Sequence, residues 1–180
     1  NGAVLALSGN GSVFNSAVLD NGTLDTSQST IGVAVGSLAG NGVLILGSMG
    51  MTLVAADDTF AGSIQGSGGL TVSGGTQTLT SVNSFTGPVT IDSNGTLVLS
   101  GAGSVSQASG VEDNGIFDIS GTANGTSITT LSGSGSVLLA GNTLTLSDAS
   151  DTFAGSMAGS GGLTVSDAVK LPRPDAAPYP

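Results

Sequence analysis

The sequence predicts an all-β protein that folds as a parallel β-helix, a solenoid with coils of about 20 residues. Three observations lead to this prediction. A long segment recurs at a fixed offset, apolar centres return every 18 to 21 residues, and short strand-like segments are bounded by Gly, Asn, Asp or Ser. No window has a sustained helical period, and the many glycines disfavour a helix.

The repeat is clearest in one glycine-rich block. The segment DTFAGSIQGSGGLTVS at residues 58–73 returns as DTFAGSMAGSGGLTVS at residues 151–166, and only Ile64 and Gln65 are replaced. Two shorter matches occur in the same order: residues 20–27 with 113–120 at the same offset, and residues 7–13 with 99–105 one residue out of register. Together they indicate a duplicated unit of about 93 residues.

The repeated block shows which positions the fold requires. We expect Phe60 and Phe153 to be packed rings, residues 66–69 to form a turn and residues 70–72 to form the next strand. The two substituted positions are expected to tolerate change. Although it is rich in glycine, the block has no lysine and no following helix, so it does not resemble a phosphate-binding loop.

The shorter rhythm comes from segments rich in Val, Leu, Ile and Thr. Their expected apolar centres are Leu5, Leu24, Leu44, Leu79, Leu97, Phe117 and Leu138. One coil cannot bury its own apolar face, so several coils must stack. At the spacing between strands of ~4.8 Å, roughly eight coils would form a rod about 40 Å long.

Two other all-β folds compete with the solenoid. Seven Asn-Gly pairs punctuate the chain, and this dipeptide is typical of tight hairpins in an antiparallel sandwich. A long duplication in the same order is unusual for such a sandwich, and Asn-Gly also suits the corners of a solenoid. An outer-membrane β-barrel would need aromatic girdles, but the chain has no Trp and its single Tyr is Tyr179.

Charge divides the chain into two parts. Residues 1–169 carry acids and no bases, whereas the only basic residues, Lys170 and Arg173, lie in a proline-rich segment at 170–180. We therefore predict a β-helical domain at 1–169 and, at 170–180, a linker or an added sequence.

The acidic balance of the chain disfavours nucleic acid and anionic membrane surfaces as partners. Because no apolar run reaches about 18 residues, we expect no membrane insertion by this segment.

Catalytic residue types are scarce. The chain has no His and no Cys, and its single Lys lies in the tail, so the usual activating bases and zinc ligands are missing. We predict no catalytic, cofactor-binding or metal-binding residues, and no cofactor. Carboxylate pairs are the one alternative, because they could serve glycoside hydrolysis or bind calcium. The candidates are Asp20 with Asp25, Asp113 with Asp118, Asp57 with Asp58, and Asp92 with Asp113 about one coil later.

Part of the chain resembles a known family. The stretch GLTVS at 69–73 and the stretch TQTLTSVNSFTGPVTIDSNGTLVLSG at 76–101 resemble the passenger-associated transport repeat of bacterial autotransporters. That repeat has a G-x-L-T-L-x-G start, an N-x-Y-T-G-x-T-x-I centre and a G-T-L-x-L end. Phe85 stands where the repeat usually has Tyr, and Pro88 where Gly is common. After Ser166 the second repeat gives way to the proline-rich segment.

The resemblance implies a right-handed β-helix that is exported through the outer membrane of a Gram-negative cell. It further implies a secreted or cell-surface location and a non-catalytic role as stalk or adhesin scaffold. The partners implied are a host surface protein or glycan, or neighbouring passengers. From the stacking itself we also expect weak end-to-end association, because open coil ends can pair between chains.

Overall fold

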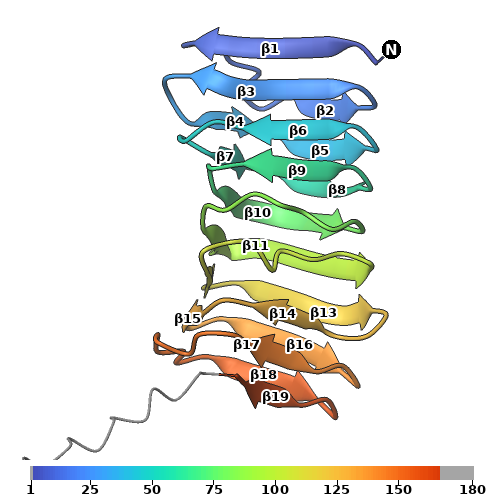
Figure 1. Ribbon diagram of the computed structural model, residues 1–180, viewed down its shortest axis with the longest axis vertical. Coiled ribbons are helices and arrows are strands. Elements are labelled where there is room, and N and C mark those ends of the chain that lie inside the picture. The colour runs from blue at the N-terminus through green and yellow to red at the C-terminus, as the bar shows by residue number, and fades with distance from the viewer. Residues whose placement is uncertain (1, 167–180) are drawn as a thin grey trace, which may run out of the picture.

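The chain forms a single stack of coils. A computed structural model describes residues 2–166, in which the chain winds in a right-handed sense and the coils descend from the N-terminal end (Figure 1). Every strand pairing in this part of the chain is parallel, and no helix occurs there. The predicted parallel β-helix is therefore confirmed, and the antiparallel sandwich is excluded.

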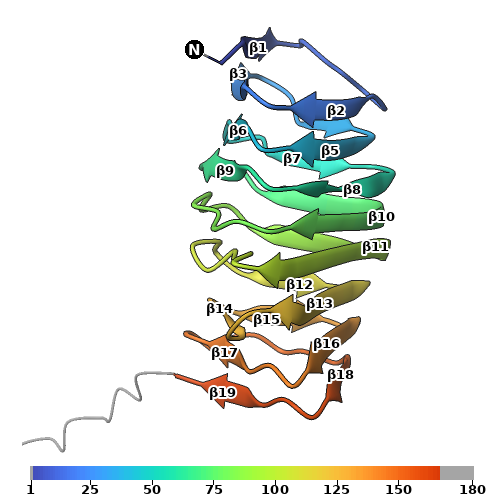
Figure 2. The ribbon, with the colours of Figure 1, turned by 90° about the vertical axis from the view of Figure 1, so that its right-hand side faces the viewer.

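Each coil has three sides, which we call faces A, B and C (Figure 2). Face A contains β2 (Ala17–Asp20), β5 (Ser37–Gly40), β8 (Ala56–Phe60), the second halves of β10 (Leu70–Leu79) and β11 (Val89–Gly101), β13 (Ile116–Thr122), β16 (Ser136–Ala140) and β18 (Ser156–Gly159). Face B contains β1 (Val4–Gly9), β3 (Thr23–Ser29), β6 (Val43–Leu46), β9 (Ser63–Gly66), β14 (Thr126–Ile128), β17 (Leu144–Leu146) and β19 (Leu163–Val165). Face C contains β4 (Val33–Val35), β7 (Met51–Leu53), the first halves of β10 and β11, β12 (Val111–Asp113) and β15 (Leu131–Gly133).

Strands β10 and β11 turn the corner between faces C and A, so these two faces join into one continuous sheet. On face B, two segments without named strands replace the ladder between β9 and β14. In the first of them, residues 84–86 lie against β9, and their backbone amides donate hydrogen bonds to the carbonyl oxygens of Ile64 and Gly66 in the preceding coil. The stack therefore continues through a region that has no regular strand on one of its three faces.

Coil length follows from the register on face C. Val33 pairs with Met51, Met51 with Leu70, Leu70 with Val89, and Val89 with Val111. The steps are 18, 19, 19 and 22 residues, which confirms coils of about 20 residues. Small differences in length are taken up partly by register shifts within paired strands, as between Val98 and Ser100 of β11.

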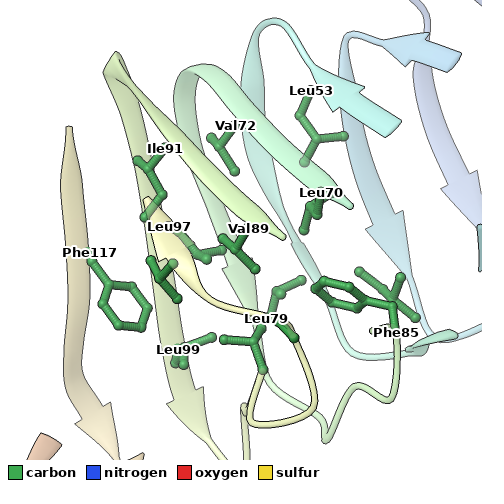
Figure 3. Packing of buried hydrophobic residues seen from close by; sticks show 14 of the residues in the cluster. Leu53, Leu70, Val72, Leu79, Phe85, Val89, Ile91, Leu97, Leu99 and Phe117 are labelled. Carbon is green, nitrogen blue, oxygen red and sulfur yellow. The ribbon is translucent and has the colours of Figure 1, made fainter. Parts of the chain in front are cut away.

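Apolar side chains, most of them aliphatic, fill the interior of the stack (Figure 3). Leu70 and Val89 are fully buried partners on face C, and Leu97 and Phe117 are fully buried partners on face A. Each buried aliphatic side chain contributes about 1.5–3 kcal/mol relative to an exposed one. Since a single coil is too thin to bury these groups, this stabilisation depends on stacking.

Five of the seven expected apolar centres are buried, but Leu5 and Leu138 are not. Leu5 lies in the first coil, where it is 52% exposed. Leu138 belongs to an apolar run in which its neighbours Val137 and Leu139 point inward instead. The period was therefore predicted correctly there, but the inward-facing positions in β16 were not, because an unbroken apolar run does not reveal its alternation.

The duplication is rotated around the rod axis. The corner at residues 20–22 leads from face A to face B, whereas its copy at residues 113–115 leads from face C to face A. The offset of 93 residues therefore spans four full coils and two faces of a fifth, which again gives about 20 residues per coil. As a result, the two copies present their equivalent corners in different directions.

Candidate functional site

The duplicated corner carries a buried carboxylate in both copies. Asp20 ends β2 and Asp113 ends β12, and their side chains are 7% and 0% exposed. In each copy the Oδ1 atom accepts a hydrogen bond of 3.0 Å from the backbone N–H two residues later, at Gly22 and Gly115. The Oδ2 atoms of both residues are buried and have no hydrogen-bond partner within the described residues.

The next coil leaves room for each carboxylate. A Cβ atom on Gly42 would lie 2.5 Å from Asp20 Oδ1, and one on Gly135 would lie 2.6 Å from Asp113 Oδ1. Backbone hydrogen bonds of 2.8 Å run from Gly42 to Asp20 and from Gly135 to Asp113. The glycine of one coil and the carboxylate of the previous coil therefore form one corner unit, which sequence analysis did not identify as such.

Burial changes the acidity of one of these groups. Desolvation raises the pKa of Asp113 to about 6, against an ordinary value of 3.8, and the hydrogen bond from Gly115 only partly offsets this increase. The described part of the chain contains no Lys, Arg or His that could pair with the carboxylate. The ionised form of Asp113 is thus disfavoured in the folded state.

In the two pairs formed with Asp20 and Asp113, the second aspartate lies beyond the corner. Asp25 is on face B and Asp118 is on face A, and each accepts a backbone hydrogen bond of 2.8 Å, from Ser27 and Ser120 respectively. Hydrogen bonds from Ser27, first its hydroxyl and then its backbone amide, hold the pKa of Asp25 below its ordinary value. These acids bind the backbone within their own strands, and each occupies a different face from its expected partner.

Asp92 and Asp113, the candidate pair about one coil apart, could have stacked on each other, but they do not. The register places Ile91 opposite Asp113 and Thr90 opposite Glu112, so Asp92 falls beyond the paired segment. Asp92 is half-buried, whereas Asp113 points fully inward. The reason is that the coil between them is 22 residues long at this point, and residue spacing alone does not reveal where the extra residues are placed.

Asp57 and Asp58 point to opposite sides of β8, as expected for neighbours in a strand. Asp57 is exposed, whereas Asp58 is half-buried and accepts a hydrogen bond from the Ser37 hydroxyl. Asp58 is also the register partner of Gln77, which is fully buried. The interior of face A thus contains a short polar stretch that sequence analysis missed, although the polar residues at alternating strand positions were a signal.

Gln77 holds three chain segments together. Its Nε2 group donates to the carbonyl oxygens of Leu38, Asp58 and Thr78, at 2.9, 3.1 and 3.2 Å, while its Oε1 atom has no partner within the described residues. On face B, buried Asn83 plays a similar part. Its Oδ1 accepts from Ile64 at 2.9 Å and its Nδ2 donates to Ser104 at 3.0 Å, so it connects three successive coils where regular strands are missing.

Among the surface pockets of residues 2–166, the four best defined are not lined by both members of any expected acidic pair. The pocket at the N-terminal coil has a volume of about 380 Å³ and is lined by Val4, Leu5 and Asp20 among others. On face C, two shallow pockets of about 220 Å³ meet at Pro88. One of the two is lined by a row of register partners, Thr52, Thr71 and Thr90.

Within residues 2–166, no group of three or more acidic side chains is arranged to hold a metal ion. The same part of the chain contains no helix long and apolar enough to cross a membrane. The predicted boundary at residue 169, the proline-rich segment at 170–180 and both basic residues lie outside the described residues.

Comparison with known proteins gives no relative. No family model, no curated protein and no solved structure matches the chain.

Proposed function

We propose that this chain is a non-catalytic β-helical segment of a secreted or cell-surface passenger, of the kind found in bacterial autotransporters. Its role is that of a stalk or adhesin scaffold, which holds binding surfaces at a distance from the cell and supports export. The observation that carries the proposal is the unbroken parallel stacking from Val4 to Val165. The resemblance of residues 69–73 and 76–101 to the passenger repeat supports the part of the proposal that concerns secretion.

The physical argument concerns vectorial folding. In a solenoid each coil contacts only its neighbours, so a chain that emerges gradually can add one coil at a time. All long-range pairings here join strands of adjacent coils, about 20 residues apart. The absence of cysteine fits passage as an unfolded chain, since no disulfide can form before export. Partners of such a scaffold are a host surface protein or glycan, or neighbouring copies.

The test is surface display. The chain is fused between a signal peptide and an outer-membrane translocator in a Gram-negative cell, and externally added antibody and protease report its exposure. We expect the segment to reach the surface and to resist protease there. Retention inside the cell, or arrival in a form that protease degrades at once, would contradict the proposal.

A carbohydrate-active β-helix that uses aspartate pairs is the alternative from sequence. The arrangement described above does not favour it, because Asp20 and Asp113 point inward while Asp25 and Asp118 lie across a corner. A panel of polysaccharides tests it directly. Turnover that disappears when Asp25 and Asp118 are replaced by Asn would support the enzyme and overturn the scaffold.

A further inference from the structure

We propose that the Asp113 corner is a pH-responsive element of the rod, which stacks tightly against the next coil in acidic solution and loosens towards neutral pH. The proposal rests on three features of the corner. The residue is fully buried, and within residues 2–166 one of its carboxyl oxygens has no hydrogen-bond partner and no cation balances its charge. An ionised carboxylate in such a position lacks both water and a counter-charge.

The elements packed around Asp113 offer its charge no compensation. Strand β11, on the preceding coil, contributes Asp92, and the coil of Asp113 itself contributes Glu112 and Asp118. Strand β15, on the following coil, contributes no titratable group. Within residues 2–166 none of these elements supplies a cation, so the cost of desolvating the ionised carboxylate is not offset by a counter-charge.

Opening the corner would relieve this cost. Asp113 pairs with Ile91 on one side and Gly133 on the other, and the Gly135 amide donates to the Asp113 carbonyl oxygen at 2.8 Å. If the coil that begins at Gly133 moves away, water reaches the carboxylate and the ionised form becomes stable. The hydrogen bond that must break is therefore that of the Gly135 amide, whereas the Gly115 bond favours the ionised carboxylate and is expected to persist.

The sign of the pH effect follows from the raised pKa of about 6. The folded state holds its proton between the ordinary value of 3.8 and about 6, whereas the unfolded state has lost it. The stabilisation is therefore complete below pH 3.8 and is lost as the pH rises through 6. A difference of about two pKa units corresponds to a change of roughly a hundredfold in the unfolding equilibrium.

The experiment compares Asp113→Asn with Asp118→Asn, which removes the same charge from a half-buried site in the same coil. Urea unfolding is measured between pH 4.5 and 7.5 for both variants and for the unchanged chain. We expect Asp118→Asn to keep the decline in stability with pH, and Asp113→Asn to lose most of it. Equal pH profiles for the two variants would overturn the proposal.

A second measurement needs no variant, in case Asp113→Asn does not fold. Carboxyl carbon NMR of the unchanged chain follows the titration of Asp113, and hydrogen exchange follows the Gly135 amide. We expect titration near pH 6 and protection factors that fall across the same range. Titration near pH 4, or protection factors independent of pH, would overturn the proposal.

Discussion

Single glycines decide whether neighbouring coils can approach at the corners. Gly66 has a φ of +109°, in the left-handed region that L side chains rarely adopt, and a Cβ atom there would overlap the carbonyl oxygen of Leu46 in the previous coil. Gly141 is a natural comparison, since its φ is ordinary and a Cβ atom would meet nothing within 4 Å. The repeated block thus uses its first turn glycine for shape.

We predict that Gly66→Ala destabilises the protein by about 3 kcal/mol, because it combines backbone strain with a clash against backbone. Gly141→Ala should change the free energy of unfolding by less than about 0.5 kcal/mol. Urea denaturation monitored by circular dichroism measures both. Similar effects of the two substitutions would show that the close approach at Gly66 is unimportant.

The two phenylalanines of the repeated block differ in burial, although the segments around them are nearly identical in sequence. Phe60 is fully buried between neighbouring coils, whereas Phe153 is half-buried near the last described coil. Their rings have the same close neighbour, since Cβ atoms on Gly62 and on Gly155 would overlap Phe60 and Phe153 respectively. The expectation of two packed rings is therefore fully met at Phe60 and partly met at Phe153.

We predict that Phe60→Ala costs about 3–5 kcal/mol of stability, the usual range for removing a fully buried ring. Phe153→Ala should cost clearly less, because part of that ring is already in water. Thermal melts of the two variants provide the comparison. If Phe153→Ala were the more damaging substitution, the packing described for these two coils would be wrong.

The coil is the element that can be added or removed. Val89 pairs with Leu70 before it and Val111 after it, so residues 89–110 form one complete coil. Removing them places Val111 directly after Pro88, where Val89 stood, and each of the three faces loses one layer. Removing about half a coil would instead bring strands of different faces together and reverse which side chains point inward.

We predict that deletion of residues 89–110 leaves a folded, shorter rod with an unchanged strand content per residue. Deletion of residues 89–99 should leave a chain that is unfolded or aggregated. Circular dichroism and size-exclusion chromatography distinguish these states. A half-coil deletion that folds as well as the full-coil deletion would contradict the description of the coil as the unit of the fold.

At the scale of the whole molecule, the fold could be predicted from the sequence because its signals are periodic. Apolar centres and the long repeat define the coil length without any knowledge of contacts. The inward positions were less certain where apolar residues follow one another, as at Leu138. The buried polar side chains of Gln77 and Asp113 were missed for another reason. Whether such a residue points inward depends on how many residues each corner contains, and the spacing of apolar residues does not reveal that number.

The rotation of the duplicated unit also emerged only from the three-dimensional arrangement. Two copies at an offset of 93 residues could have lain one above the other if the coil length divided that offset evenly. Because it does not, the corners of Asp20 and Asp113 face different directions. A partner that recognises this corner would therefore meet it on two sides of the rod, separated by more than four coils.

The central claim is that successive coils stack in parallel and in the described register, and disulfide trapping tests it most directly. The chain has no native cysteine, and Thr71 pairs with Thr90 while Thr76 pairs with Thr96. Parallel partners lie ~4.8 Å apart, within the range that a disulfide can bridge.

Cysteine pairs at 71/90 and 76/96 should therefore cross-link readily under mild oxidation, with the protein remaining folded. The exchanged pairs, 71/96 and 76/90, use the same four positions and should not cross-link. Mass spectrometry after proteolysis identifies the bonds. Equal cross-linking of the exchanged pairs, or failure of both register pairs in folded protein, would contradict the stacked β-helix.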